Sequence, residues 1–432
     1  MTSESKKQKT VLIQIISEQT LPNLACVKAI NPDKIWSLYT KSEKMEKKAR
    51  IIEAFISKYA LCPDCRKYSI QNPSPSIKEV SEIVETLVKE EKKEDEAVRL
   101  IVNYTGGRKP MSIGAYYAAQ KLGAEAIYTE DGKTISGGEN NAPLQVVPAF
   151  SIEEMLDAQG YEEHTSETIT ENRLNIAREI YGLRISNVNS DNEQRFVFYP
   201  AEKEKEWGLK LRKWENRQDF MNALTQVENY FQEVIKFSNL RNGLYENALR
   251  LCEQENWLVK NNGNYKISSN LIDRNENSFR IYAKLSFANN FLDGGWWEIL
   301  VAKAFQEQFG EENVLWSLKP QKRPRRCTNM QNSQENHGEN EDDVLAVHDN
   351  RLYVVSCKAG FYQNKFAETL GQLCSRAKSL GGHQAIPVFA YTHLNNLHPD
   401  HRAYGNLLGI RFVGTDDIFD PERFSKCLNQ KN

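Results

Sequence analysis

The feature that most constrains the fold of this chain is a pair of apolar segments that meet at a polar turn. Leu345 to Val347 and Leu352 to Val355 flank Asp349 and Asn350, a pattern typical of a tight β-hairpin. Because side chains alternate between the two faces of a strand, a turn centred on these two residues fixes which residues lie opposite one another. The pattern therefore predicts both a hairpin and its register.

The open end of this hairpin is rich in charged and polar side chains. The predicted register sets Asp343 opposite Ser356 and Glu341 opposite Lys358, with all four side chains on one face of the sheet. Two carboxylates beside an ammonium suit the cleavage of phosphodiesters with a divalent metal. Taken alone, however, such a hairpin favours the simpler interpretation of an edge element that ends in a solvated salt bridge.

An acidic helix start upstream changes this interpretation. The sequence Gly294-Gly295-Trp296-Trp297-Glu298 opens an amphipathic run from Ile299 to Phe309. After the hairpin we expect a helix from Lys365 to Ser379 and a strand from Ala385 to Ala390. An acidic helix before a D…xK hairpin, followed by these elements, resembles the PD-(D/E)xK restriction-endonuclease-like fold.

The resemblance implies a role for each polar group. Glu298 and Asp343 would hold Mg²⁺ or Mn²⁺ through oxygen, because these hard cations prefer carboxylates, and Cys357 is a further candidate metal ligand. Lys358 would orient or deprotonate the attacking water and stabilise negative charge on the phosphate. The implied activity is that of a metal-dependent endonuclease.

One position departs from the family pattern. The residue two positions before the lysine, which is acidic in the family, is Ser356, a neutral and weaker metal ligand. Three outcomes stay open: another acid supplies the missing charge, the metal binds loosely, or the domain is inactive. We favour compensation by Glu341 or Glu298, with Asp342 within reach of the same strand end.

The bulk properties of the chain exclude several protein classes. Its 432 residues are enough for two or three domains, and 40% apolar with 26% charged content is typical of a globular protein. No apolar run is long enough to span a membrane, the N-terminus lacks a secretory signal, and a net charge of −2 argues against a basic nucleic-acid coat. We therefore expect a cytoplasmic protein whose eight cysteines are reduced thiols.

The N-terminal third alternates between apolar strands and helices. We expect strands at Val11 to Ile16, Lys34 to Tyr39 and Ala97 to Tyr104, and helices at Glu43 to Tyr59, Ser76 to Glu90 and Pro110 to Leu122. Alternation of this kind implies a mainly parallel, doubly wound sheet with right-handed crossovers. Ligands of such sheets bind beyond the carboxyl ends of the strands.

Two polar loops are predicted at that edge. Ser17 to Thr20 follows the first strand, and Thr105 to Lys109 follows the strand that begins at Ala97. The second loop has glycines that let the backbone approach a phosphate, a helix N-terminus behind them, and two cations. It lacks both GxxxxGK[ST] and GxGxxG spacing, which disfavours a Walker-type site and a dinucleotide cofactor.

The two loops resemble a known sensor. The segment Val11 to Asn23, with SEQTLPN after its strand, and the segment Asn103 to Met111, NYTGGRKPM, are similar to the CARF domain, the CRISPR-associated Rossmann-like sensor. Together with GGWWE, NEDDV and SCK they resemble the CARF–PD-(D/E)xK fusion nucleases that accompany type III CRISPR systems. The resemblance covers about residues 11–150 and 290–415.

The CARF resemblance implies a regulated enzyme. The activator would be a cyclic oligoadenylate, foremost cyclic tetra-adenylate, bound across the two-fold axis of a homodimer, because a symmetric ring suits two identical sets of loops. The substrate would be single-stranded RNA or DNA, or nicked duplex DNA, cut with little sequence specificity. The residues implied to contact the activator are Ser17, Glu18, Gln19, Thr105, Gly106, Gly107, Arg108 and Lys109, with Arg108 either on a phosphate or in solvent.

The expected fold is α/β, with a Rossmann-like CARF domain at residues 1–155, a connector at 156–285 and a restriction-endonuclease-like domain at 286–432. The connector is expected to be mostly helical, with a polar linker from His164 to Thr170 and helices from Asn172 to Leu183 and from Gln218 to Phe237; a winged helix is the alternative. The basic stretch from Lys319 to Arg326 is either a solvated loop or a grip on the phosphate backbone.

Two other functions stay open at this point. Because Ser356 replaces an acid, the protein could be a catalytically inactive, messenger-gated regulator that binds nucleic acid. Alternatively, the loop from Thr105 to Lys109 could hold the nucleotide cofactor of a small-molecule enzyme. Assays of cleavage with Mn²⁺ and of messenger binding against common dinucleotides distinguish these alternatives.

Overall fold

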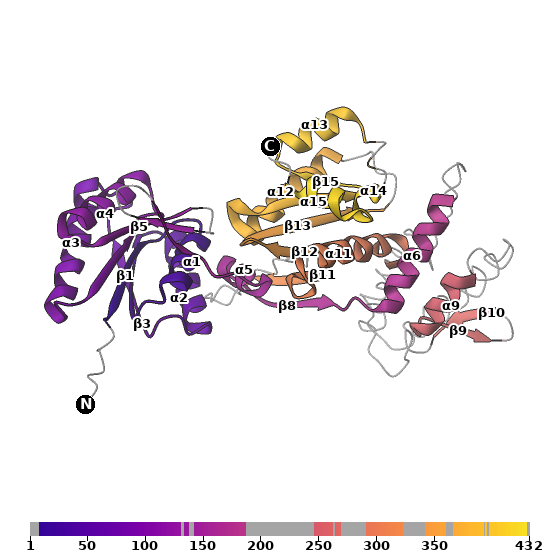
Figure 1. The fold of residues 1–432 in the computed structure, drawn as a ribbon, viewed down its shortest axis with the longest axis horizontal. Coiled ribbons are helices and arrows are strands. Elements are labelled where there is room, and N and C mark those ends of the chain that lie inside the picture. The colour runs from indigo at the N-terminus through magenta and orange to yellow at the C-terminus, as the bar shows by residue number, and fades with distance from the viewer. Residues whose placement is uncertain are drawn as a thin grey trace, which may run out of the picture.

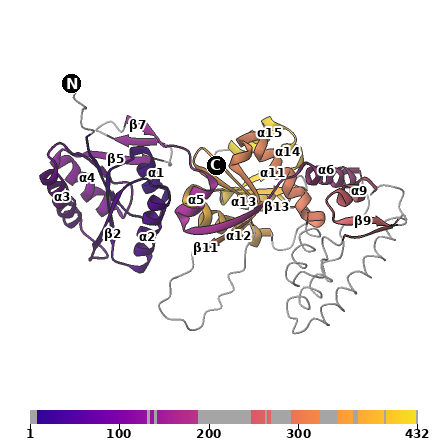
Figure 2. The same ribbon diagram turned by 90° about the horizontal axis from the view of Figure 1, so that it is seen from below.

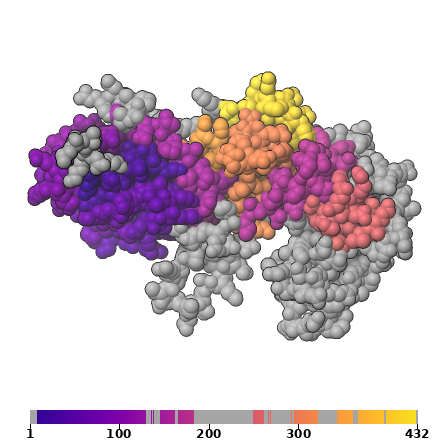
Figure 3. All heavy atoms as spheres, turned by 60° about the horizontal axis from the view of Figure 1, so that its bottom comes forward, coloured from indigo at the N-terminus to yellow at the C-terminus, as the bar shows by residue number. Residues whose placement is uncertain are grey.

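The computed structural model describes residues 8–130, 134–137, 142–186, 246–261, 264–268, 291–322, 342–359, 366–392, 394 and 397–429. These residues form an elongated molecule, with an N-terminal α/β unit at one end, a second α/β unit in the middle, and a small helix with a hairpin at the other end (Figure 1). The two α/β units are adjoining lobes in a space-filling view (Figure 3). Helix α5 (Ile152–Gln159) lies between them (Figure 2).

The N-terminal unit is built on a seven-stranded sheet with the strand order β3-β2-β1-β4-β5-β6-β7. The first five strands are parallel to their neighbours, whereas β6 and β7 add an antiparallel hairpin at one edge. The strands are β1 Thr10–Ile15, β2 Lys34–Thr40, β3 Asp64–Ile70, β4 Arg99–Asn103, β5 Glu125–Glu130, β6 Thr134–Gly137 and β7 Ala142–Val146. The parallel, doubly wound sheet predicted from the alternating pattern is confirmed.

Four helices cover the two faces of this sheet. On one face α3 and α4 pack together, and on the other lie α1 and α2. Their bounds are α1 Leu21–Ile30, α2 Glu43–Lys58, α3 Ile77–Glu94 and α4 Lys109–Leu122. Ser42 and Ser76 cap α2 and α3, because their side chains accept hydrogen bonds from backbone N–H groups of the first turn. The sequence did not predict β3, since this edge strand is mostly polar and exposed.

The second unit is built on a six-stranded sheet with the order β15-β14-β13-β12-β11-β8. The strands β8, β11, β12 and β13 pair antiparallel, and β13, β14 and β15 pair parallel. The strands are β8 Tyr161–Glu167, β11 Val314–Lys322, β12 Asp342–His348, β13 Arg351–Lys358, β14 Ile386–Tyr391 and β15 Arg411–Val413. The carboxyl ends of the three parallel strands therefore share one edge.

The predicted hairpin and its register are confirmed. Val344 lies opposite Val355, and His348 lies opposite Arg351. The turn residues Asp349 and Asn350 have φ of 53° and 57°. Positive φ at both central residues is the geometry of a type I′ turn, whose twist matches that of the flanking strands.

The alternation along this hairpin builds two separate cores. One face packs against α11 (Trp296–Phe309) and the other against α12 (Phe366–Gly381). The α11 face includes Val344, Ala346, Tyr353 and Val355, and the α12 face includes Leu345, Val347, Leu352 and Val354. The α12 core continues without interruption through α5 into the N-terminal unit, where it includes Leu24 and Phe55. The two units therefore share apolar packing.

The connector differs from the expectation in one respect. The segment predicted as a polar linker is largely strand β8, which pairs antiparallel with β11 at the edge of the second sheet. The predicted helix that follows is present as α6 (Glu171–Ser186) and packs against α11. Farther along, α9 (Glu246–Gln254) precedes an antiparallel hairpin of β9 (Leu258–Asn261) and β10 (Asn264–Ile267). The predicted helix from Gln218 to Phe237 lies outside the described residues.

Three further helices complete the C-terminal part: α13 Pro399–Leu407, α14 Thr415–Ile418 and α15 Pro421–Asn429. The helix and strand predicted after the hairpin are present as α12 and β14. None of the helices that the structure describes is long and apolar enough to cross a membrane.

Candidate functional site

Helix α11 begins against the carboxyl end of β13. The indole of Trp297 donates a hydrogen bond to a main-chain oxygen of β14 at 3.0 Å, which anchors the start of the helix to the sheet. Just before the helix, a Cβ on Gly294 would lie 3.9 Å from the Cβ of Ala359, the residue that follows Lys358. Glu298, in the first turn of the helix, is thereby held close to the end of β13.

The carboxylate of Glu298 is half-buried and has a defined partner. Trp316 Nε1 lies 3.4 Å from Glu298 Oε2 and donates a hydrogen bond to it. Trp316 on β11 pairs with Val344 on β12, the residue that follows Asp343. The indole therefore holds the Glu298 carboxylate beside the strand that carries Asp343.

Asp343 lies where the ladder between β12 and β13 ends. Its Oδ2 accepts a hydrogen bond from the backbone N–H of Cys357 at 2.6 Å, so its carboxylate spans the gap between the two strands. The Cys357 thiol is fully buried, and burial raises its pKa well above the usual value. The charges of Asp343 and Glu298 raise this pKa further, and Lys358 acts in the opposite direction. Glu298, Asp343 and Lys358 therefore all belong to the elements that meet at the carboxyl end of β13.

The Cys357 side chain is buried, and its backbone N–H positions the Asp343 carboxylate. Its role as a metal ligand stays a prediction. The two carboxylates, Glu298 and Asp343, are hard oxygen donors that fit Mg²⁺ or Mn²⁺. Within the ranges that the structure describes, no three His, Cys, Asp or Glu side chains are grouped so that they could hold a metal ion.

The acid next to Asp343 has a structural partner. Arg376 of α12 donates to both oxygens of Asp342, at 2.8 and 2.6 Å, and the Asp342 side chain is 4% exposed. Burial acts to lower the pKa of Arg376, but the hydrogen bond and charge of Asp342 outweigh it and the pKa is raised. The idea that Asp342 compensates for Ser356 is therefore wrong, because its charge is already neutralised. Glu341 lies outside the described residues.

Ser356 itself is half-buried and pairs with Phe389 across β13 and β14. Lys358, two positions on, is also half-buried and pairs with Tyr391. Its main-chain oxygen accepts a hydrogen bond from the backbone N–H of Thr392 at 3.1 Å. The backbone at position 358 is therefore fixed on one side by β14, which defines where its side chain starts.

At the N-terminal sheet, the two predicted loops lie side by side because β1 and β4 are neighbours. A Cβ on Gly106 would lie 1.9 Å from the Ile15 oxygen, so only glycine fits against the end of β1. Gly107 has φ of +81°, which favours glycine as well. Ser112 Oγ donates to the Gly106 oxygen at 2.8 Å and ties the loop to the first turn of α4.

A network of buried amides and hydroxyls supports these loops. Asn103 Oδ1 accepts hydrogen bonds from both the backbone N–H and the hydroxyl of Thr105, and Thr105 Oγ1 accepts one from the Thr129 N–H at 2.7 Å. Asn23 Nδ2 donates to the Ile15 oxygen at 2.9 Å. Three buried atoms of this network, Asn23 Oδ1, Asn103 Nδ2 and Thr129 Oγ1, have no hydrogen-bond partner among the described residues. Unpartnered buried polar atoms are costly, so this edge favours a polar ligand.

The first loop is shaped by its own hydrogen bonds. Ser17 Oγ donates to the Gln19 oxygen at 2.8 Å and accepts from the Gln19 N–H at 3.2 Å. Glu18 points outward to Lys44 of α2 at 2.6 Å, and the hydrogen bond with Lys44 lowers the pKa of the Glu18 carboxyl. His383, from the corner between α12 and β14, acts on the same carboxyl in the same direction. This loop therefore lies near the second unit.

The two cations of the second loop differ in their surroundings. Arg108 Nη1 donates to Ser74 Oγ at 2.9 Å, so its side chain reaches the turn before α3. Lys109, the first residue of α4, is exposed. A phosphate at the start of α4 would meet the helix N-terminus and the Lys109 ammonium.

Two contacts link the N-terminal loops and the hairpin of the second unit. Thr20, which ends the first loop, is fully buried, and its hydroxyl donates to the Ala158 oxygen in α5. At the hairpin turn, Asn350 Oδ1 accepts from the Phe150 N–H at 2.8 Å and its Nδ2 donates to the Pro148 oxygen at 3.4 Å. The turn whose strands end at Asp343 and Lys358 is thus bonded to the segment that leaves the N-terminal unit.

Comparisons with known proteins find matches for both units of the chain. Residues 11–155 match the family of Card1 CARF domains, and residues 286–422 match the family of Card1-like endonuclease domains. No curated protein matches the chain. Can2 from Sulfobacillus thermosulfidooxidans, solved in complex with cyclic tetra-adenylate, is 16% identical, with a TM-score of 0.61 over 98% of this chain and 100% of that chain.

A second solved structure, protein VC1899 from Vibrio cholerae, is 15% identical, with a TM-score of 0.62 over 96% of this chain and 97% of that chain. At such low identity the two structures show a common fold. The two matched ranges include the residues of both sites described above. The chain therefore belongs to the CRISPR-associated CARF nucleases, in which a Card1 CARF domain precedes a Card1-like endonuclease domain.

Proposed function

We propose that this protein is a metal-dependent nuclease, activated by cyclic oligoadenylate, that acts as a homodimer in the cytoplasm and cuts RNA or DNA with little sequence specificity. The observation that carries the proposal is the placement of Glu298 and Asp343 on neighbouring elements, with Lys358 directly after Cys357, whose backbone N–H binds Asp343. The match of this region to Card1-like endonuclease domains supports a nuclease. The CARF match and the cyclic tetra-adenylate bound to Can2 support the activator.

In the proposed reaction each residue has a distinct task. Glu298, held by Trp316, and Asp343, held by the Cys357 N–H, would bind Mg²⁺ or Mn²⁺. The bound ion would polarise the scissile phosphate. The Lys358 ammonium donates to the phosphate oxygen that gains charge and orients the attacking water. Because Asp342 is neutralised by Arg376, Glu298 is the described acid that replaces the one missing at Ser356.

We propose that cyclic tetra-adenylate binds at the carboxyl-end edge of the N-terminal sheet, where residues 17–20 and 105–109 lie. This edge is called the CARF edge below. The backbone around Gly106 and Gly107 lets the phosphodiester ring approach, and the start of α4 with Lys109 attracts its charge. The unpartnered oxygens of Asn23 and Thr129 lie in the network that supports the two loops. The remaining contacts are proposed for Ser17, Glu18, Gln19, Thr105 and Arg108.

An exposed apolar surface beside this edge supports the homodimer. Ile113 and Tyr117, one turn apart on α4, are 41% and 58% exposed, and Ile77 at the start of α3 is 40% exposed. The two helices touch there, since a Cβ on Gly114 would lie 2.5 Å from the Ile77 oxygen. A second copy that covers this surface would bring two sets of messenger loops to one ring.

Coupling between the sites would pass through the shared core. Thr20 connects the first messenger loop to α5, and α5 packs against α12. Asn350 connects the exit from the CARF domain to the hairpin that ends in Asp343 and Lys358. Messenger binding would shift the population between two placements of these packed elements.

The test is cleavage of labelled single-stranded RNA, single-stranded DNA and plasmid with Mn²⁺, with and without cyclic tetra-adenylate. We expect messenger-dependent cutting that Lys358→Ala abolishes without a change in messenger affinity. Lys109→Ala should raise the messenger concentration needed for activation, whereas Lys121→Ala, at the other end of α4, should not. Mass measurement by light scattering should give two copies per particle.

The alternative is a messenger-gated regulator that binds nucleic acid without cutting it. Ser356 and the lack of a three-ligand metal group among the described residues favour it. Intact substrate under every condition above, with messenger-dependent binding of nucleic acid, would establish the regulator and overturn the nuclease.

A further inference from the structure

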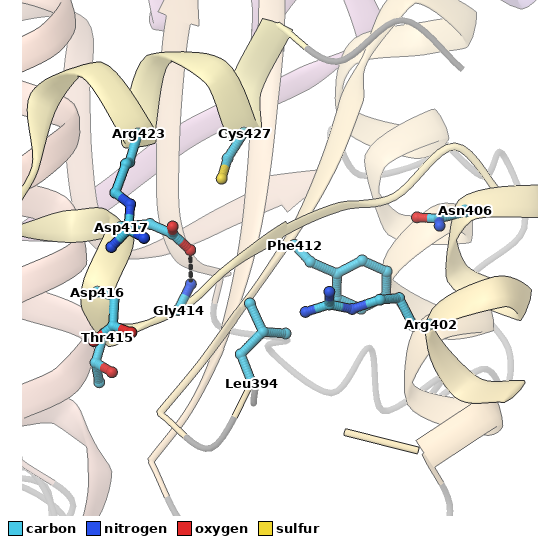
Figure 4. Close-up of a pocket in the computed structure, with 10 residues that line it drawn as sticks. All are labelled: Leu394, Arg402, Asn406, Phe412, Gly414, Thr415, Asp416, Asp417, Arg423 and Cys427. Atoms are coloured by element: carbon cyan, nitrogen blue, oxygen red, sulfur yellow. Dashed lines mark hydrogen bonds between the residues drawn. The ribbon is translucent and has the colours of Figure 1, made fainter. Parts of the chain in front are cut away.

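A pocket of about 320 Å³ opens beside the catalytic edge, between β15, α13, α14 and α15. Its walls include Leu394 and Phe412, and two arginines enter it from different helices, Arg402 from α13 and Arg423 from α15 (Figure 4). Both arginine side chains are exposed at its mouth. The pocket therefore combines an apolar wall with two guanidinium groups.

Two acids, Asp416 and Asp417, line the same pocket as the guanidinium groups. Asp417 Oδ2 accepts a hydrogen bond from the Gly414 N–H at 2.7 Å, which caps α14 (Figure 4). No ion pair joins Arg402 or Arg423 to a carboxylate among the residues that the structure describes. Asp417 therefore has a structural task, and the two cations are open to a ligand.

The half-buried Cys427 thiol lines the pocket together with the two arginines. Burial raises the pKa of Cys427 to about 11, with Asp417 acting in the same direction, whereas Arg402 and Arg423 both act to lower it. In Figure 4 the Cys427 sulfur points into the pocket between these two side chains. Two guanidinium groups directed at one cavity form a typical site for a phosphate, which they can hold through paired N–H groups.

The pocket lies on the same edge of the sheet as the catalytic lysine. Lys358 pairs with Tyr391 on β14, and the preceding residue Ala390 pairs with Val413 on β15. Gly414, the next residue, begins the pocket wall. Two strand spacings are about 10 Å, so a strand whose scissile phosphate lies at Lys358 would bring a nearby phosphate to the pocket.

We propose that this pocket binds a backbone phosphate of the nucleic-acid substrate, close to the bond that is cut. This inference rests on the proposed nuclease function, because the strand is placed by a scissile phosphate at Lys358. Arg402 and Arg423 grip the phosphate, and Phe412 and Leu394 offer an apolar surface to the adjoining nucleotide. The contact carries no base identity and therefore suits cleavage with little sequence specificity.

The experiment measures binding separately from cleavage. The full-length protein, in EDTA to prevent cleavage and with cyclic tetra-adenylate, is titrated onto fluorescent single-stranded DNA and RNA of the same sequence. Arg402→Ala and Arg423→Ala are each expected to weaken binding about tenfold, as for the loss of one charge-assisted hydrogen-bonded contact. The slope of log affinity against log salt should fall by about 0.7 for the phosphate contact that is lost.

The control is Lys426→Ala, which removes an exposed charge from α15 outside the pocket. Arg423→Lys should recover part of the binding, since a lysine keeps the charge but not the paired geometry. Unchanged affinity and salt slope in both arginine variants would overturn the proposal, as would an equal loss in Lys426→Ala. The pocket could instead hold a free anion. In that case inorganic phosphate would bind to the pocket, the arginine variants would lose this binding, and their affinity for the strands would be unchanged. That result would also overturn the proposal.

A failed nuclease assay is distinguishable from a failed pocket. If the protein binds strands but never cuts them, the binding measurement still reports on Arg402 and Arg423. If it cuts strands and the arginine variants have normal affinity, the pocket assignment fails while the nuclease stands.

Discussion

The CARF edge and the nuclease edge, where Asp343 and Lys358 lie, occupy the same position in their sheets but have different tasks, ligand recognition and catalysis. Both lie at the carboxyl ends of parallel strands, where a helix N-terminus meets the sheet. At the CARF edge the described residues are glycines, amides and hydroxyls, with cations only at the rim. At the nuclease edge, the carboxyl end of β13, the described residues include two carboxylates and a lysine: Glu298, Asp343 and Lys358.

The difference follows from what each edge has to do. A sensor must recognise a ligand and report it, so a rigid network of neutral groups, whose hydrogen bonds strengthen in a dry interior, is sufficient. A hydrolase must stabilise charge that develops during the reaction, so it needs fixed charges and tolerates the cost of holding them together. Substitutions at the nuclease edge should therefore change the rate with little change in stability. Substitutions at the CARF edge should change stability and activation together.

The largest effect is expected from Asp343→Asn. The amide oxygen can still accept the hydrogen bond from the Cys357 N–H, but the negative charge is gone. We expect cleavage to fall about a thousandfold with an unchanged melting temperature. The matched control is the neighbouring Asp342→Asn, which breaks the buried pair with Arg376 and should cost about 3 kcal/mol of unfolding free energy. If Asp342→Asn and Asp343→Asn shared one profile, the distinction between the adjacent acids would fail.

The next effect tests the CARF edge. Gly106→Ala places a Cβ 1.9 Å from the Ile15 oxygen, so the loop must move away from β1. We expect a loss of about 2 kcal/mol of unfolding free energy and a loss of messenger binding. The control is Gly371→Ala inside α12, where a Cβ meets nothing within 4 Å and should stabilise the helix by about 1 kcal/mol. Calorimetry and messenger titration check both; normal messenger affinity in Gly106→Ala would contradict the sensor assignment.

The sequence predicted the elements of both edges where local pattern determines structure. The hairpin register followed from its turn, and the parallel sheet followed from the alternation of strands and helices. The same reasoning missed the edge strands β3 and β8, which lack the apolar signal of buried strands. It also did not predict β5 and β11, which lie inside their sheets. It also could not separate Asp342 from Asp343, since their partners come from elements far apart in the chain.

The buried amide network shows a second limit of sequence reasoning. Asn23 and Asn103 stood within the recognised motifs, yet nothing in the pattern showed that they are buried beside the glycine loop. Burial of a polar side chain depends on which elements pack around it, and this is a tertiary property. The same holds for the pocket of Arg402 and Arg423, whose members come from separate helices.

A smaller effect should reveal how the two edges communicate. Asn350→Gly keeps a residue that tolerates the φ of 57° but removes the hydrogen bonds to Phe150 and Pro148. We expect the ratio of cleavage rates with and without messenger to fall about fivefold, which corresponds to one lost hydrogen bond. Asp349→Gly, at the neighbouring exposed turn position, should keep the ratio. An unaltered ratio in Asn350→Gly would mean that coupling bypasses the hairpin turn.

The smallest effect sharpens the nuclease edge itself. Ser356→Glu restores the acid that the family pattern has two positions before the lysine, next to the buried Cys357 and across from Phe389. If the missing charge limits metal affinity, the Mn²⁺ concentration for half-maximal cleavage should fall about threefold, because one added carboxylate strengthens the binding of the ion. The cleavage rate at saturating Mn²⁺ should stay unchanged, since only ground-state binding is affected. Ser356→Gln, of similar size but neutral, is the control. A fall in the saturating rate with the glutamate would instead indicate that the neutral residue is part of the active geometry, and that Glu298 and Asp343 are sufficient without a third acid.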